Sequence, residues 1–284
     1  MNKILIDSHC HAWKTWPYRP TVPDPESHGS IEQLIYEMDG NQVSRACVVC
    51  AQIELNPDNN TYIAESVERF PNRLHQFADL DSEWSKTYHL PGVLKRLNML
   101  VRRWPIAGFT HYLVKEEDGA WLHSNEGLSL LEEAANRRLI ASFSCYPHQQ
   151  EAIRKAAERV PNLPILCHHM GHPRFGKGSL DENLEQLRLS SRVPNIYLKV
   201  SGFYYGEQKP WEYPFPKSLD LLKTLYDSFG PERLCWGSDF PVSRFYVTYQ
   251  QTVEAFRSHA SFIPSPDKDL ILGINLARLL KILE

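Results

Sequence analysis

The sequence predicts an α/β fold, a (β/α)₈ TIM barrel in a single domain that covers residues 1–284. Short apolar runs rich in β-branched or aromatic residues alternate along the chain with longer amphipathic stretches, the pattern of strand–helix units around a parallel sheet. Eight such runs can be counted, which is the number of strands in this barrel, and the chain length suits it. No glycine-rich phosphate turn follows the first run, which argues against a doubly wound open sheet.

The predicted elements follow one another in a regular order. The strands are expected at residues 4–10, 45–52, 74–81, 106–113, 139–145, 164–170, 196–202 and 233–239. The helices are expected at residues 30–42, 60–71, 90–104, 125–138, 148–160, 181–191, 216–229 and 248–259. Several of these stretches end just before a Pro or Gly, as helices commonly do. A further apolar stretch, 269–282, predicts a ninth helix that packs on the barrel.

Two Pro-rich segments, 16–27 and 206–217, follow the first and the seventh predicted strands. They are expected to form long loops over the barrel mouth, because loops after the strands of such a barrel usually shape a substrate pocket.

The charge composition of the chain indicates which kinds of partner to expect. The 31 basic and 34 acidic residues give a formal charge of −3, and no Lys/Arg run or basic helix face is present, so nucleic acid is not an expected partner. The first apolar stretch is too short for a signal peptide, and none approaches the roughly 18 residues of a membrane span. We therefore expect a cytoplasmic protein, not bound to membranes, that acts on a small-molecule substrate. The oligomeric state stays open.

Six cysteines are too few for a disulfide scaffold in a chain of this length, so reduced thiols are expected. Cys47 and Cys50 form a C-x-x-C pair, which could indicate a metal or redox site. Residues three apart on a strand point to opposite faces, however, so two buried core cysteines are the favoured interpretation.

Polar residues at the ends of the apolar runs are the candidates for chemistry, because the site of such a barrel lies at the C-terminal ends of its strands. His9 and His11 end the first strand, and their i, i+2 spacing predicts that both imidazoles face one point, with Asp7 further down the same face. Asp239 ends the eighth strand, where a carboxylate can bind a metal or take a proton from water. A helix cap or turn role is the structural alternative for Asp239.

His168 and His169 close the sixth strand. Since neighbouring strand residues point to opposite faces, only one of them is expected to face the barrel interior, with the other in a packing or hydrogen-bonding role. His111 ends the fourth strand, where a ligand role and a structural role are both open.

Five segments together resemble the amidohydrolase-related family, in the branch that contains 2-pyrone-4,6-dicarboxylate lactonase and the fucono- and rhamnonolactonases. They occur in the family's order from residue 4 to residue 282. The segments are Asp7-x-His9-x-His11, His168-His169-Met170-Gly171-His172-Pro173, Leu198-Lys199-Val200-Ser201-Gly202, Trp236-Gly237-Ser238-Asp239-Phe240-Pro241 and Leu272-Gly273-Ile274-Asn275-Leu276-Ala277-Arg278-Leu279.

The resemblance implies a hydrolase that opens lactones. It implies that Asp239 activates the attacking water and that His9, His11 and His169 contact the lactone carbonyl or a metal that polarises it. Such a reaction needs a base beside water and donors where the oxyanion develops. Four further residues are expected to bind the substrate: His111, Lys199, Arg174 and Tyr204.

The sequence departs from the family pattern at three places. His168 stands where the branch usually has Asp, Thr110 replaces a common Arg, and the fifth strand carries no His or Lys. Loss of the Arg removes an anchor for a substrate carboxylate. The missing strand-five ligand counts against the main rival function, a non-oxidative decarboxylase of the same superfamily. A catalytically silent barrel that serves as a binding module is the third alternative.

Two alternatives stay open for metal. One Zn²⁺ could be held by His9, His11 and Asp239, since three protein ligands suffice for a catalytic zinc site. Otherwise no ion binds, and at least one imidazole must carry a proton on the nitrogen that faces the carbonyl.

Overall fold

The computed structural model describes residues 4–283. Its eight strands form one parallel sheet in which each strand pairs with the next along the chain. They are β1 (Ile6–Cys10), β2 (Arg45–Val49), β3 (Leu74–Asp79), β4 (Gly108–Tyr112), β5 (Ile140–Ser144), β6 (Ile165–Cys167), β7 (Ile196–Val200) and β8 (Leu234–Trp236).

The sheet closes where the segment after β8 returns to β1. The Asp239 amide donates to the His9 carbonyl (2.8 Å), and the His11 amide donates to the Phe240 carbonyl (2.6 Å). Closure through these residues brings the end of the chain's first strand beside the end of its last. The predicted TIM barrel is confirmed.

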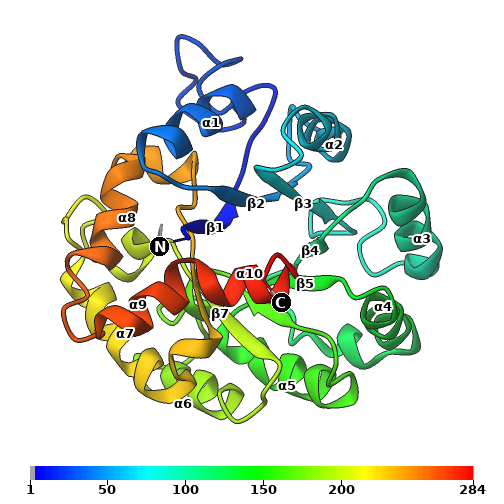
Figure 1. Ribbon diagram of the computed structural model, residues 1–284. Coiled ribbons are helices and arrows are strands. Elements are labelled where there is room, and N and C mark those ends of the chain that lie inside the picture. Colours follow the sequence, from blue (N-terminus) through cyan, green and yellow to red (C-terminus); the bar gives the residue numbers. More distant parts are fainter. Residues whose placement is uncertain (1–3, 284) are drawn as a thin grey trace.

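Helices surround the barrel, as Figure 1 shows in a view along its axis. Each of the eight expected helices is present within a few residues of its expected position. They are α1 (Ile31–Gly40), α2 (Asn59–Arg69), α3 (Val93–Arg103), α4 (Asn125–Asn136), α5 (Gln150–Arg159), α6 (Leu180–Ser190), α7 (Pro216–Phe229) and α8 (Tyr249–Arg257). Side-chain caps fix several starts, such as Ser30, whose hydroxyl accepts from the Gln33 amide.

Two apolar layers result from the alternation of strand side chains. One fills the barrel interior and includes Phe77 and Leu166, while the other lies between strands and helices and includes Phe109 and Phe143. The pair Cys47 and Cys50 is divided between the layers, Cys47 in the interior and Cys50 outside it. All six cysteines are free and buried. The core interpretation of this pair is therefore confirmed.

The C-terminal stretch differs from the single helix expected at 269–282. It consists of α9 (Ser265–Asp269), a π-helical turn (Leu270–Ile274) and α10 (Asn275–Leu279). Figure 1 shows α10 crossing in front of the strands, and its Leu276 joins the interior apolar cluster. This segment thus covers the end of the barrel opposite to the strand C-termini.

The Pro-rich loops behave differently from each other. Trp16 and Tyr18 of the first contact Phe245, which follows β8, so this loop lies beside the barrel mouth. In the second, Trp211 is 68% exposed and Tyr213 contacts His259 beyond α8. The expectation that both loops shape the mouth is therefore supported for 16–27 only, because Trp211 of 206–217 is exposed and Tyr213 packs beside His259. Within residues 4–283, no helix is both long enough and apolar enough for a membrane span.

Candidate active site

Along β1, the side chains do not alternate regularly between the interior and the exterior of the barrel. The pairing of β1 with β2 shifts between Asp7 and Cys10, so a bulge separates Asp7 from the two histidines. Asp7 points out of the barrel, where its carboxylate accepts from the amides of His9 (3.0 Å) and Ser238 (2.9 Å) and from the Tyr249 hydroxyl (2.8 Å). The expectation that Asp7 shares a face with His9 was wrong, because the bulge changes the parity. Asp7 joins β1 to the segment after β8 instead.

His9, His11 and Asp239 converge at the closure of the barrel. The Nε2 atoms of His9 and His11 lie 3.4 and 3.6 Å from Asp239 Oδ1. His11 Nδ1 lies 2.9 Å from the carbonyl oxygen of Val49, which can only accept, so Nδ1 carries a proton and Nε2 faces Asp239. All three side chains are buried.

Asp239 adopts a left-handed backbone conformation (φ 55°), which turns its carboxylate toward the imidazoles. The Tyr204 hydroxyl donates to Asp239 Oδ2, and His169 Nδ1 lies 3.9 Å from the same oxygen. Burial by itself raises the pKa of the Asp239 carboxyl, but His169, His11 and Tyr204 outweigh it and hold the pKa below its usual value. The carboxylate is therefore ionised and able to accept a proton at neutral pH.

Both histidines at the end of β6 face the barrel interior. His168 Nε2 lies 2.7 Å from Ser142 Oγ on β5, and the rings of His168 and His169 lie 4.4 and 4.5 Å from that of His9. The expectation that only one could point inward was wrong. His169 (φ 47°) and Met170 (φ 57°) are left-handed, so the strand ends at Cys167 and its alternation no longer applies.

Lys199 on β7 lies inside the barrel beneath His9 and is fully buried. Its Nζ lies 2.7 Å from Ser142 Oγ and 3.2 Å from His9 Nδ1, and it stands 5.2 Å from the centre of the Phe77 ring. Burial lowers the pKa of this amine to about 8. Its amine is enclosed by these side chains, and the expected contact with substrate stays a prediction.

Three imidazoles of the site, those of His9, His168 and His169, are uncharged at neutral pH. Burial lowers the pKa of His169 to about 4, and burial together with the Lys199 charge lowers the pKa of His9 and of His168 well below the usual value. Neutral imidazoles can serve as hydrogen-bond donors or as metal ligands, depending on which nitrogen carries the proton.

The other expected substrate contacts are placed in different ways. Tyr204 is in the site, where it holds Asp239, whereas Arg174 is exposed and lies at the rim near His169. His111 points into the outer layer, where its ring meets those of Trp121 and Phe143, so it is separated from the cluster. The strand-end position alone does not determine the face.

Tyr112, the neighbour of His111, was missed by sequence reasoning. Its ring lies 5.1 Å from that of His168, and the nearby Asp239 charge adds to burial in raising the pKa of its phenol. Counting inward positions along β4 from Gly108 could have found it, because residues two and four positions later share one face. Tyr18 and Tyr205 also lie near enough to Asp239 for its charge to raise the pKa of each phenol. Aromatic rings thus surround the carboxylate.

The donor atoms suit one zinc ion. Ring nitrogens of His9 and His11 and an oxygen of Asp239 lie within 4.8 Å of one another, as do ring nitrogens of His9, His168 and His169. His9 Nε2 and His168 Nδ1 are buried without a hydrogen-bond partner. Neutral imidazoles with a carboxylate favour Zn²⁺ over Mg²⁺. The contact of Lys199 with His9 Nδ1 opposes ligation by His9, because it favours the proton on Nε2.

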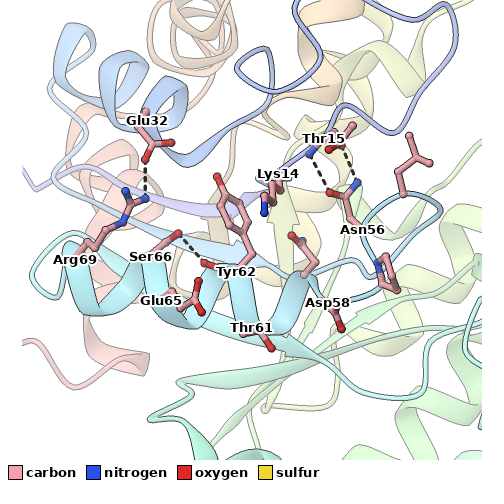
Figure 2. A pocket seen from close by; sticks show the side chains of 13 residues that line it. Lys14, Thr15, Glu32, Asn56, Asp58, Thr61, Tyr62, Glu65, Ser66 and Arg69 are labelled. Atoms are coloured by element: carbon pink, nitrogen blue, oxygen red, sulfur yellow. Dashed lines mark hydrogen bonds and ion pairs between the residues drawn. The ribbon is translucent and has the colours of Figure 1, made fainter.

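A separate cavity of about 610 Å³ lies between α2 and the loop after β1 (Figure 2). Polar side chains line it, and Figure 2 shows the ion pair of Glu32 with Arg69 at one side and the hydrogen bonds of Thr15 with Asn56 at the other. No member of the histidine–aspartate cluster lines this cavity. We therefore place the candidate active site at the cluster.

Comparisons with known proteins find related sequences and solved structures of the same fold. L-fucono-1,5-lactonase of Burkholderia ambifaria is 31% identical over 101 residues, which are 34% of this chain and 33% of that protein. A zinc-bound amidohydrolase structure from Burkholderia multivorans superimposes with a TM-score of 0.77 at 18% identity, covering 98% of this chain and 99% of the other. The 5-carboxyvanillate decarboxylase of Sphingomonas paucimobilis gives a TM-score of 0.67 at 14% identity, with 99% of each chain covered.

These structural similarities show the fold. The family assignment comes from the sequence: the family model described as amidohydrolase matches residues 6–282 of this chain. This match begins at β1, ends beyond α10 and includes every residue of the buried cluster. The chain therefore belongs to the amidohydrolase family.

Proposed function

We propose that this protein is a lactonase that opens a small sugar-acid-like or pyrone lactone, with Asp239 activating the attacking water. The observation that carries the proposal is the buried, ionised Asp239 carboxylate among the imidazoles of His9, His11 and His169. The partial similarity to L-fucono-1,5-lactonase supports this choice of substrate class.

The arrangement provides each proton transfer that lactone hydrolysis needs. Asp239 takes a proton from water while the water oxygen bonds to the carbonyl carbon. An imidazole N–H donates to the oxyanion that develops on the carbonyl oxygen. When the intermediate collapses, the ring C–O bond breaks and Asp239 returns its proton to the leaving oxygen, which gives a hydroxy acid.

One metal ion is an alternative to the imidazole donor in this proposal. One Zn²⁺ would be held by His9, His11 and Asp239 and would supply a Lewis acid for the carbonyl. No second ion is expected, because strand five ends in Ser144 and offers no bridging ligand.

A substrate screen tests the proposed activity. Neutral aldonolactones and pyrone lactones are incubated with the protein and hydrolysis is followed by proton release, each with and without a chelator. The well-folded Asp239→Asn variant serves as the control. Hydrolysis of at least one lactone by the wild-type protein alone supports the proposal, and a lack of turnover across both classes contradicts it.

The alternative function is a non-oxidative decarboxylase, which the fold similarity to 5-carboxyvanillate decarboxylase keeps in consideration. It would take an aromatic carboxylate and release CO₂. Assaying CO₂ release from such acids in the presence of zinc separates the two reactions. A protein that binds these ligands but turns over none of them would instead be a catalytically silent binding module.

A further inference from the structure

Lys199 is the buried charged group for which the proposed mechanism has no role. It is enclosed in the barrel, and among the described residues no ion pair to a carboxylate is found for it. Its two polar contacts are Ser142 Oγ and His9 Nδ1. An uncompensated buried ammonium costs stability, so its presence calls for a function.

The contact with His9 has a definite direction. A lysine ammonium has three N–H donors and no acceptor, so at 3.2 Å it donates to His9 Nδ1. The neutral ring then carries its proton on Nε2. That nitrogen faces the Asp239 side of the site and has no hydrogen-bond partner of its own.

His9 and His11 therefore differ in tautomer. The Val49 carbonyl accepts from the Nδ1–H of His11, so the neutral ring of His11 would have the lone pair of Nε2 facing the site. Lys199 favours the opposite arrangement in His9. A metal-free hydrolysis needs an N–H that faces the carbonyl, and His9 Nε2 provides it.

We propose that Lys199 is a positioning residue that holds His9 in the Nε2–H tautomer, which makes His9 the oxyanion donor and weakens its use as a zinc ligand. Zinc ligation by His9 Nε2 would place the ring proton on Nδ1, directly against the donors of Lys199. The role in turnover rests on the proposed lactonase function, whereas the tautomer and the zinc affinity are properties of the protein without substrate.

The tautomer is measured directly by ¹H–¹⁵N NMR of the full-length protein with ring-labelled histidine. The His9→Gln spectrum identifies the His9 signals. In the metal-free wild-type protein, we expect a protonated Nε2 and an unprotonated Nδ1. Protonated Nδ1 in the wild-type protein overturns the proposal, and this measurement needs no Lys199 variant to fold.

Lys199→Met removes the donors while nearly preserving the shape of the side chain. We expect its His9 signals to shift toward the Nδ1–H tautomer and its zinc affinity, measured by competition with a chromophoric chelator, to rise about tenfold. Ser142→Ala is the matched control, because it removes the other acceptor of Lys199 and leaves the contact with His9. Its His9 tautomer should remain that of the wild type.

The two proposals fail separately. An unchanged His9 tautomer and unchanged zinc affinity in folded Lys199→Met contradict the role of Lys199, whatever the activity. If these measurements agree with expectation and no lactone is hydrolysed, the lactonase assignment is wrong while the role of Lys199 stands. If lactones are hydrolysed, Lys199→Met should lower kcat about 100-fold and leave KM nearly unchanged, since the oxyanion exists only in the transition state.

Discussion

Asp239, like His169, is placed by a left-handed backbone conformation as well as by its contacts. A left-handed conformation is costly for a residue other than glycine, and it persists here because the Asp239 amide is held by the His9 carbonyl and the carboxylate by Tyr204. The same hydrogen bond closes the barrel. The position of the Asp239 carboxylate is therefore tied to the closure of the barrel.

Asp239→Asn should lower kcat by about 10²–10⁴-fold, the range typical of a lost general base. The amide keeps the shape and can still accept from Tyr204, but it does not take a proton from water. Steady-state kinetics on the lactone found in the screen measure the change, and a melting curve checks that the variant is folded. Near-normal turnover by the folded variant would remove Asp239 from the mechanism.

Tyr204→Phe should move the acidic limb of the pH profile of kcat/KM to higher pH. The hydroxyl stabilises the Asp239 carboxylate and helps to lower its pKa. Without the hydroxyl, the pKa of Asp239 rises. As the pH is lowered, the carboxylate is then protonated at a higher pH than in the wild type, and activity is lost there. Tyr246→Phe is the control, because the Tyr246 ring touches that of Tyr204 from the partly exposed rim. Equal shifts in both variants would contradict a specific role for the Tyr204 hydroxyl.

The sequence predicted the convergence of His9, His11 and Asp239 because strand spacing and strand ends carry that information. It could not predict that both His168 and His169 face inward, since that depends on left-handed backbone at His169 and Met170. It also assigned His111 in place of Tyr112, because the face of a polar strand-end residue depends on which neighbours fill the barrel. Alternation along β4 would have identified Tyr112, but the same rule failed at β1 and after β6, where a bulge and left-handed residues interrupt it.

At the scale of elements, β1 and the segment after β8 are joined by one carboxylate. Asp7 accepts three hydrogen bonds, two from backbone amides and one from Tyr249 on α8. Burial raises the pKa of Asp7 to about 6, so these bonds are made at the expense of desolvating the carboxylate. The bulge that allows them also directs His9 and His11 inward.

Asp7→Ala should lower the free energy of unfolding by about 3 kcal/mol, because each buried donor left without an acceptor costs about 1–3 kcal/mol. Urea denaturation measures the loss. Tyr249→Phe removes only one of the three bonds and should cost about 1 kcal/mol. If the two variants lose the same free energy of unfolding, the hydrogen bonds from the His9 and Ser238 amides to Asp7 do not contribute to stability.

At the scale of the whole molecule, the two ends of the barrel differ in what they carry. The strand C-termini carry the histidine–aspartate cluster, and the opposite end is covered by the C-terminal segment through Leu276 and Ala277. Eight strand–helix units were predictable because their period is repeated along the whole chain. The π-helical turn in the last stretch was not predictable from a local pattern, and its Gly273 approaches Ile4, which is distant in the sequence.

Gly273 tests the separation of the two ends. A Cβ on Gly273 would lie 2.2 Å from the carbonyl oxygen of Ile4, so Gly273→Ala must displace the C-terminal segment from β1. We expect the melting temperature to fall while KM stays close to the wild-type value, since the cluster lies at the other end. Gly40→Ala is the matched control. Nothing lies within 4 Å of a Cβ at the end of α1, so that variant should be neutral or slightly stabilised, by at most about 1 kcal/mol. A Gly273→Ala protein as stable as Gly40→Ala would show that the C-terminal segment does not need its close approach to β1.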